Sequence, residues 1–270
     1  MSRSKVGRAL LAGLCSTCVL GQEVSASDDP SESVPESDAQ SLSQAANDPT
    51  ASLAAVQLQY QYVTGYHNLP GESGSFPRLR TVVPFSTGSL KQIARITLPF
   101  VADSPANESG LADAVLFDLA VFEHAWGRWG VGPVMLVPTA TDKKLGGEKW
   151  AMGPAIGLVA RKEKMLIGLF SQNLFTFAGD DDRTDINVSI IQPILNYSLP
   201  DHWSVGLSEM NITFDWKKRD WTNLPLGAKV SKLAHIGKLP VQFFAKAEYN
   251  FADDDALPEW TNTLGLKLLF

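Results

Sequence analysis

The chain has 270 residues, of which 44% are hydrophobic and 19% charged, with a formal net charge of -6 at pH 7. This composition excludes a disordered or collagen-like chain. After the N-terminus no run of eighteen uncharged apolar residues occurs, so a helical membrane span is excluded and only a closed barrel could cross a membrane. From residue 54 onwards acidic and basic residues nearly balance, and we therefore expect no nucleic-acid partner.

Residues 1–26 have the pattern of a secretory signal peptide. Three basic residues lie within the first eight, a short apolar run continues to Leu20, and small residues follow up to Ala26. The alternative is a short buried helix. Cys15 and Cys18 both lie in this segment, so the exported chain is expected to have no disulfide and no cysteine-based metal site.

Residues 27–53 are rich in Ser, Asp, Glu, Ala and Pro and contain no Lys or Arg. This composition predicts a disordered acidic linker between the signal peptide and a domain spanning residues 54–270. A second possibility is that the segment folds back into the interior of that domain.

From Val56 onwards the dominant period is two. Between Val56 and Tyr62 every second residue is apolar or aromatic and the others are Gln. This pattern predicts strands with one oily and one polar face. Their length and spacing favour tilted membrane-spanning strands over a soluble sandwich. We predict an all-β fold, an antiparallel transmembrane barrel of about twelve strands, near residues 54–66, 76–86, 92–102, 111–124, 129–140, 149–161, 165–178, 185–199, 202–217, 222–234, 240–252 and 259–270.

The predicted connections alternate in length. One set is short or compact (86–91, 161–164, 199–202, 235–240), and the other is mostly longer and more charged (68–75, 103–110, 141–149, 179–185, 217–220, 252–259). Outer-membrane barrels have short periplasmic turns and longer extracellular loops. Because the strand number is even, the start of the first strand and the end of the last strand are both expected on the short-turn side.

Two features disturb the regular pattern. The apolar parity changes within 202–217, which predicts a bulge near Ser208–Glu209. Proline also occurs inside predicted strands, where it removes a ladder donor; these residues are Pro84, Pro99, Pro138, Pro154, Pro193 and Pro225.

If the apolar parity faces lipid, the opposite parity lines the lumen. The candidate lumen residues are Gln57, Gln59, Gln61, Arg78, Arg80, Arg95, Asp118, Asn211, Thr213, Asp215, Lys229, Lys246, Glu248 and Lys267. The arginines at 78, 80 and 95 come from neighbouring strands and resemble the cationic ladder of an anion pore. The alternative is pairing with the carboxylates at 118, 215 or 248. A twelve-stranded barrel lies between filled and open barrels, so the sequence leaves both an open pore and a packed interior possible.

Other residues are typical of a membrane barrel. Trp and Tyr near the predicted strand ends suit interfacial girdles, namely Trp126, Trp129, Tyr197, Trp203, Trp216, Trp221 and Trp260. The alternative is that they are core aromatics of a soluble fold. Leu266, Leu268 and the terminal Phe270 form the kind of last-strand signal that outer-membrane assembly machinery recognises. The acidic clusters 180–182 and 253–255 are expected to be solvated turns, with divalent-cation binding as the alternative.

Several segments resemble a family of bacterial outer-membrane barrels associated with the meta pathway of phenol degradation and often described as transporters. The resemblance covers about residues 110–270, is thinner over 54–109, and is absent before that. It implies an outer-membrane location and passage of small aromatic or hydrophobic molecules. The segments that carry it are Trp129–Pro133, Val137–Asp142, Lys149–Pro154, Phe177–Arg183, Gln192–Tyr197, Leu224–Gly227, Ile236–Lys238 and Pro258–Trp260.

The sequence therefore predicts a passive outer-membrane channel or transporter for small molecules, without a cofactor or resident metal. The expected partners are outer-membrane lipid, lipopolysaccharide, the assembly machinery and a small solute. No nucleophile, zinc, P-loop or dinucleotide motif occurs, so we do not expect an enzyme. Two alternatives are a lipid-acting outer-membrane hydrolase, which requires a Ser and a His to converge, and a structural barrel with a packed lumen.

Overall fold

The structure is a computed structural model that describes residues 36–253 and 256–270, with side chains from residue 41 onwards. The predicted signal peptide, residues 1–26, lies outside the described residues. No helix in this part of the chain is long and apolar enough to cross a membrane.

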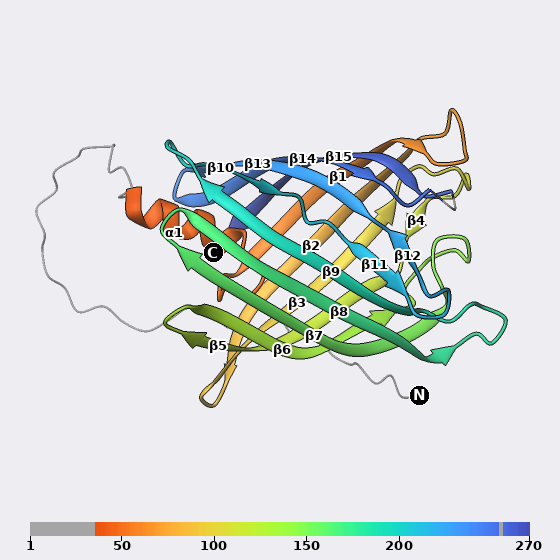
Figure 1. Ribbon diagram of the computed structural model, residues 1–270, viewed down its shortest axis with the longest axis horizontal. Helices are drawn as coiled ribbons and strands as arrows, with labels where there is room; N and C mark the ends of the chain where they lie inside the picture. The colour runs from red at the N-terminus through yellow and green to blue at the C-terminus, as the bar shows by residue number, and fades with distance from the viewer. Residues whose placement is uncertain (1–35, 254–255) are drawn as a thin grey trace, which may run out of the picture. The chain divides into compact units, whose positions relative to one another are not determined.

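Twelve antiparallel strand paths close into a barrel (Figure 1), as the sequence predicts. Two of the paths are interrupted: β10 continues as β11 and β12 continues as β13. The short β4 pairs with β3 outside the ring. The bounds are β1 Ala55–Tyr66, β2 Gly74–Thr87, β3 Leu90–Val101, β4 Gly110–Leu111, β5 Ala114–His124, β6 Gly127–Val137, β7 Lys149–Lys162, β8 Met165–Gly179, β9 Asn187–Ser198, β10 Trp203–Leu207, β11 Ile212–Asp215, β12 Asp220–Asn223, β13 Pro225–Ile236, β14 Leu239–Asn250 and β15 Pro258–Leu269.

The ring is closed by the first and last strands. β1 pairs with β15 from Ala55↔Leu269 to Tyr66↔Pro258 and with β2 on its other side. Closure gives each of the long strands a partner on both sides, which is what a sheet needs in order to lie in lipid, whereas the short β4 and β12 each pair on one side only.

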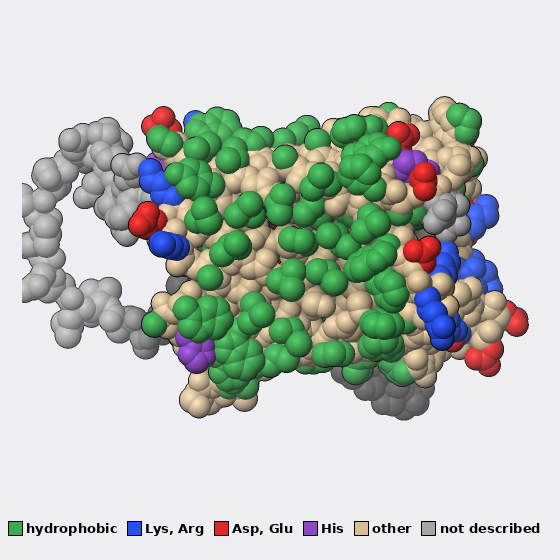
Figure 2. Space-filling view, viewed as in Figure 1, with side chains coloured by type: hydrophobic (Ala, Val, Ile, Leu, Met, Phe, Trp, Pro, Cys, Tyr) green, Lys and Arg blue, Asp and Glu red, His purple; other side chains and the backbone are tan. Residues whose placement is uncertain are grey.

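On the face shown in Figure 2, an apolar band lies between two charged ends. In β1, Leu58 and Tyr60 are each 50% exposed, whereas Gln57 and Gln59, which alternate with them, are buried inside the barrel. Alternation of this kind is the pattern of a strand with one lipid-facing side and one lumen-facing side. Trp126 and Trp203 lie near one end of the band and Trp216 near the other, all exposed, as girdle residues are.

The connections alternate as predicted. Compact turns join β2 to β3, β5 to β6, β7 to β8, β9 to β10 and β13 to β14. The first residue of β1 and the last residue of β15 lie at the same end of the barrel as these turns. We call it the short-turn end; the opposite, long-loop end carries most of the longer connections.

Four of the six prolines that the sequence places in strands do lie within strands, whereas Pro138 follows β6 and Pro225 begins β13.

The predicted disordered linker is wrong for residues 36–53. Residues Glu36–Ala46 form helix α1, and the chain then turns through Asp48 and Thr50 into β1. Helix α1 ends where it does because Pro49 cannot continue a helix and disfavours helical geometry at the residue before it. The composition alone does not favour order; order comes from packing of Leu42, Ala46 and Leu53 against the barrel wall.

Candidate functional site

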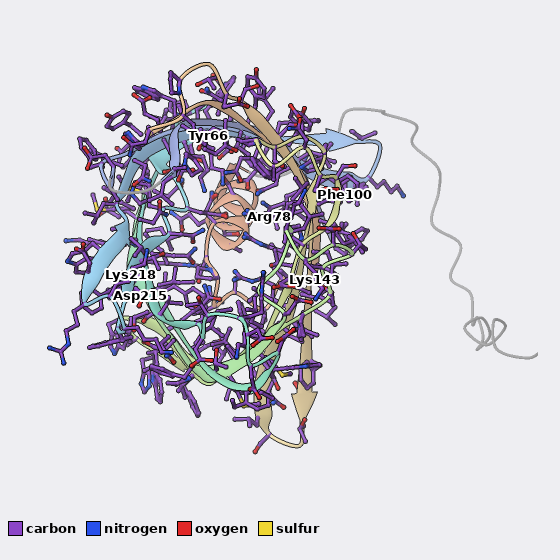
Figure 3. The ribbon with its side chains drawn as sticks, turned by 90° about the vertical axis from the view of Figure 1, so that its right-hand side faces the viewer. Tyr66, Arg78, Phe100, Lys143, Asp215 and Lys218 are labelled. Carbon is purple, nitrogen blue, oxygen red and sulfur yellow. The ribbon has the colours of Figure 1, made fainter. Side chains whose placement is uncertain are left out.

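Helix α1 occupies the short-turn mouth, and the view along the barrel shows it inside the ring of strands (Figure 3). We call residues 41–53 the mouth plug. Its main anchor is Asp48, whose carboxylate lies 3.2 Å from both Arg128 on β6 and Arg161 on β7. The Asp48 side chain is fully buried. Removing one partner of a buried ion pair costs about 3–5 kcal/mol because the other charge stays buried. The Arg128 and Arg161 side chains are 15% and 30% exposed, so we expect the lower end of this range for the loss of Asp48.

The opposite wall holds the end of the helix. Lys267 Nζ on β15 donates to the Ala46 carbonyl at 2.5 Å, and Lys229 Nζ on β13 donates to Asn47 Oδ1 at 2.8 Å. Cations at a helix C-terminus satisfy its free carbonyls and oppose its dipole. The plug is thus bound on both sides of the lumen by residues distant in sequence.

The plug also fits closely against β7. A Cβ added to Gly157 would lie 2.9 Å from Thr50 Cγ2, so only glycine leaves room for the buried Thr50 at this point. Thr50 is fixed in turn by two hydrogen bonds to Asp48 Oδ1, from its amide at 2.8 Å and its hydroxyl at 2.6 Å.

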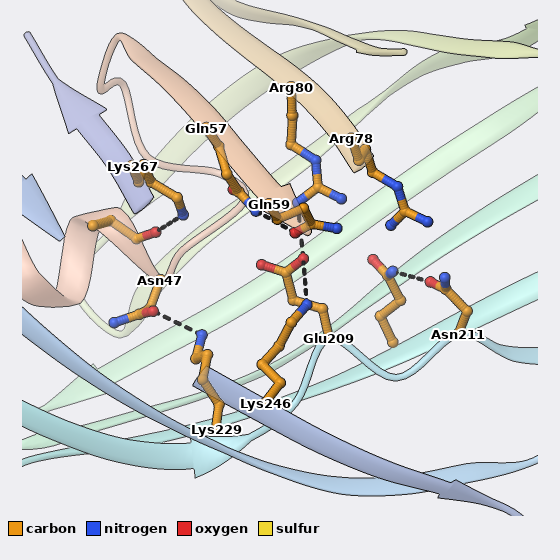
Figure 4. A network of polar contacts seen from close by, with 12 residues as sticks. Asn47, Gln57, Gln59, Arg78, Arg80, Glu209, Asn211, Lys229, Lys246 and Lys267 are labelled. Carbon is orange, nitrogen blue, oxygen red and sulfur yellow. Dashed lines mark hydrogen bonds and ion pairs between the residues drawn. The ribbon is translucent and has the colours of Figure 1, made fainter. Parts of the chain in front are cut away.

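Deeper in the barrel, an ion pair crosses the lumen (Figure 4). Glu209 Oε2 lies 2.8 Å from Arg80 Nη1 and 3.8 Å from Lys246 Nζ. Glu209 belongs to the segment 208–211, where the strand path breaks between β10 and β11. The predicted bulge is thus present as a four-residue interruption. It removes Glu209 from the ladder and lets its side chain reach β2 on another part of the wall.

Two cavities of about 100 Å³ each lie in the lumen. The inner cavity is lined by the mouth plug, Arg95, Phe117 and Phe170, whereas the outer cavity is lined by Arg78, Lys246, Glu248 and other polar residues. Arg80, Glu209 and Gln192 line both. The cross-lumen ion pair therefore stands at the boundary between the two cavities.

The two sides of the lumen differ in chemistry. Inward-facing residues of β3 and β5–β9 form a continuous apolar cluster that includes Ile93, Leu119, Val134, Phe170 and Leu174. We call this the apolar wall. The inward-facing residues of β1, β2 and β13–β15 are mainly amides and charged groups and form the polar wall. Arg95 stands where the two meet: its guanidinium lies 4.0 Å from the centroid of Phe117 and 5.6 Å from that of Phe170.

Most predicted lumen residues do lie on the inside. Gln57 donates to Gln59 at 2.7 Å, and Arg78 donates to Gln61 at 3.3 Å. The three arginines have different partners: Gln61 for Arg78, Glu209 for Arg80, and aromatic rings for Arg95. Lys229, Lys246, Glu248 and Lys267 also line the cavities.

Two predicted lumen residues do not join this group. Asp118 lies between the buried Phe117 and Leu119, so it faces the other side of β5, where Gln92 donates to it at 3.0 Å. The prediction failed because β5 is apolar on both parities. Asp215 lies at the end of β11 near the long-loop rim and accepts from the amides of Lys217 and Lys218, which makes it a turn cap.

Sequence reasoning missed Glu209, the carboxylate that pairs with Arg80 across the lumen. The parity change at Ser208–Glu209 was a usable signal, because a strand break beside a charged residue frees that residue to leave the wall. It also missed Asp48, because an acidic side chain in an acidic, Ser-rich stretch looks like a solvent-exposed one.

The long-loop end is fixed by ion pairs. Asp185 lies 2.7 Å from Lys217 and 3.0 Å from Lys149, and these hydrogen bonds lower the pKa of its carboxyl group. Lys144 donates to Glu108 at 2.7 Å, which raises the pKa of the lysine. The loops that follow β3, β6, β8 and β11 are thereby joined to one another.

The histidines do not pair with serines in the described residues. His67 Nε2 lies 2.8 Å from the Asn250 carbonyl, and His124 accepts from the Trp129 indole at 3.0 Å. Within residues 36–253 and 256–270, no Ser hydroxyl forms a hydrogen bond with a His ring. The same part of the chain holds no group of three or more His, Cys, Asp or Glu arranged for a metal ion.

A closed, twelve-stranded antiparallel barrel with an apolar outer band and a polar, partly plugged interior is the architecture of an outer-membrane barrel protein. No family model and no curated protein matches the sequence. Among solved structures, an outer membrane channel from Pseudomonas putida F1 matches with a TM-score of 0.62 at 15% identity, covering 83% of this chain and 98% of that one. Outer membrane phospholipase A from Escherichia coli matches with a TM-score of 0.46 at 11% identity, covering 84% and 97%. The first likeness supports the barrel fold alone.

Proposed function

We propose that the protein is a passive conduit for small molecules across the outer membrane, closed at rest by the mouth plug. The observation that carries this proposal is the lumen itself, which holds two cavities in line instead of a fully packed core. The short-turn mouth is filled by a segment held through polar contacts, and such contacts can be exchanged for water. No energy source or cofactor is required by this mechanism.

The charge of the lumen favours anions. Among the described residues, six cationic and three anionic side chains line the two cavities: Arg78, Arg80, Arg95, Lys229, Lys246 and Lys267 against Asp48, Glu209 and Glu248. A net positive lining concentrates anions and repels cations. The apolar wall adds a surface on which rings or chains can lie.

We also propose membership of the phenol meta-pathway family and an aromatic or hydrophobic solute, on the strength of the motifs over residues 110–270. This narrower proposal predicts that aromatic solutes permeate faster than sugars of similar size. Equal rates for the two would contradict it and leave the general conduit standing.

Export and insertion form a further part of the proposal. The signal peptide directs the chain out of the cytoplasm, the last strand with Leu266, Leu268 and Phe270 is read by the assembly machinery, and the apolar band contacts lipid and lipopolysaccharide. Of these three residues Phe270 is the most exposed, at 67%, and packs little. Phe270→Ser should therefore lower the amount of inserted barrel in cells while leaving refolded protein equally stable.

One observation favours a structural barrel with a packed lumen, namely the cross-lumen ion pair together with the mouth plug. Reconstitution separates the two functions. Vesicles containing the protein should release small anions faster than protein-free vesicles, and Asp48→Ala should increase the release further. If a correctly folded barrel carrying Asp48→Ala releases nothing, the conduit is excluded and the packed barrel remains.

The same vesicles test the lipid-acting hydrolase. We expect no fatty acid release from phospholipid, with or without Ca²⁺. Release that persists in purified protein and disappears on substitution of a single Ser or His would establish the enzyme instead.

A further inference from the structure

The inner cavity contains a cation that no carboxylate neutralises at close range. The Arg95 guanidinium has no hydrogen bond or ion pair with any described residue, and its nearest described partners are the rings of Phe117 and Phe170. Its neighbours differ in this respect, because Arg80 is paired with Glu209 and Lys267 with the end of α1. Arg95 is therefore free to bind an anion from solution.

A second polar group in this cavity is also unused. Asn196 on β9 is 2% exposed, and neither its amide oxygen nor its amide nitrogen has a hydrogen-bond partner in the described structure. A buried amide without partners costs free energy unless a water or a ligand satisfies it. Both Asn196 and Arg95 line the inner cavity.

The side of the inner cavity next to Arg95 is apolar, whereas Asp48, Glu209 and other polar groups line the rest. Phe117, Phe170 and Ile194 face it from β5, β8 and β9, and Leu207 and Val82 complete this side. A site with an unpaired guanidinium at one point and a hydrocarbon surface beside it is complementary to a molecule with a carboxylate at one end and a ring at the other. Guanidinium groups bind carboxylates through charge-assisted, often bidentate hydrogen bonds.

The volume of the inner cavity limits the size of the molecule that can enter it. Its volume of about 100 Å³ is smaller than the roughly 150 Å³ of an apolar cavity known to take up benzene. One of its walls is the plug segment from Ala45 to Ala51. A single ring therefore enters only as this segment moves aside, so that ligand binding and plug release favour each other.

We propose that the inner cavity is a binding site for small amphipathic organic anions such as monocyclic aromatic carboxylates, with the carboxylate on Arg95 and the ring against Phe117 and Phe170. Occupation of the site displaces the plug segment. The proposal rests on the proposed conduit function, for which it supplies the solute class.

Calorimetric titration of detergent-solubilised full-length protein tests the site without measuring transport. The probes are benzoate, benzyl alcohol, benzylamine and acetate, which separate the ring from the charge. We expect benzoate to bind about tenfold or more tightly than the other three, since a hydrogen bond to a charged group is worth about one to two powers of ten in affinity.

Three variants make the test specific. Arg95→Met should reduce benzoate binding to the level of benzyl alcohol. Lys91→Met is the matched control, because Lys91 lies on the same strand but is exposed and paired with Glu123; it should bind benzoate like the unmodified chain. Asp48→Ala should bind benzoate more tightly, because a site that is more often open has a higher apparent affinity.

The outcomes are distinct from those of the conduit experiment. Equal binding of benzoate and benzylamine, or full benzoate binding by Arg95→Met in a folded barrel, would overturn the site. Absence of benzoate binding even in Asp48→Ala would overturn it as well. Arg95-dependent binding in a barrel that releases no solute from vesicles would keep the site and exclude the conduit.

Discussion

The two walls of the lumen have opposite chemistry on the same barrel. The polar wall on β1, β2 and β13–β15 alternates along each strand, with Gln57 and Gln59 inside and Leu58 and Tyr60 outside. The apolar wall on β3 and β5–β9 has apolar residues on both faces, with Phe170 inside and Leu169 outside. Polar side chains in the lumen keep water and ions there, whereas the apolar wall gives a dry surface for hydrocarbon. The comparison indicates an interior suited to molecules that have both kinds of group.

The largest effect is expected where the plug meets the apolar side of the barrel. Asp48→Ala leaves Arg128 and Arg161 without their buried partner, at a cost of about 3 kcal/mol or more to the seated plug. At tenfold per 1.4 kcal/mol, the population of open barrels should rise by about a hundredfold. The measurement is the open probability in planar bilayers.

Glu123→Ala is the control for the plug experiment, because Glu123 is also a carboxylate near the short-turn end but forms an exposed pair with Lys91. Its open probability should match that of the unmodified chain. Equal opening of the two variants would mean that charge loss at this end, and not release of the plug, causes the change.

The apolar wall is expected to contribute strongly to stability. Phe170→Ala removes a fully buried ring from the cluster and should lower the free energy of unfolding by about 3–5 kcal/mol. Leu169→Ala is the matched control on the same strand, since Leu169 faces outward and is 43% exposed. Urea unfolding of the refolded barrel in detergent checks this pair. Similar losses in both variants would contradict an apolar interior wall.

A smaller effect is expected at the cross-lumen ion pair. Glu209→Gln keeps the size of the side chain, removes one negative charge and frees Arg80, so the lumen becomes more anion-selective. The shift in reversal potential under a salt gradient should be largest at low ionic strength, because charges are screened over about 10 Å at 0.1 M salt and about 30 Å at 0.01 M. An unchanged reversal potential at low salt would show that ions do not pass Glu209.

The smallest effect is expected at the long-loop end, where Asp185 joins Lys149 and Lys217. Because the folded-state pKa of Asp185 is lowered, its contribution is complete above the ordinary carboxyl pKa and is lost as the pH falls through the lowered value. The protection factors of amides in the loops around 180–186 and 217–219, which compare exchange with the intrinsic rate at the same pH, should therefore fall only in acid. Asp185→Asn should remove this pH dependence; if it persists, another group is responsible.

The fold was largely predictable, and the strand list matches the observed strands to within a few residues, because a lipid-facing band imposes period two on every strand. The polar wall followed from the same rule. The apolar wall could not be predicted in this way, since strands that are apolar on both faces show no alternation. Asp118 was consequently placed on the wrong side of β5. Helix α1 was missed for another reason: it is positioned by contacts with distant parts of the chain, which no local pattern reports. Glu209 was missed although the parity change beside it was a signal, because the strand that its side chain reaches is distant in sequence.

Single-channel conductance of the full chain and of Asp48→Ala, recorded side by side at several salt concentrations, tests most directly whether the barrel is a plugged conduit. We expect rare, brief openings in the unmodified protein and long openings of reproducible size in the variant, with an anion preference that weakens as salt rises. Silence from both proteins, with the barrel shown to be folded, would contradict it.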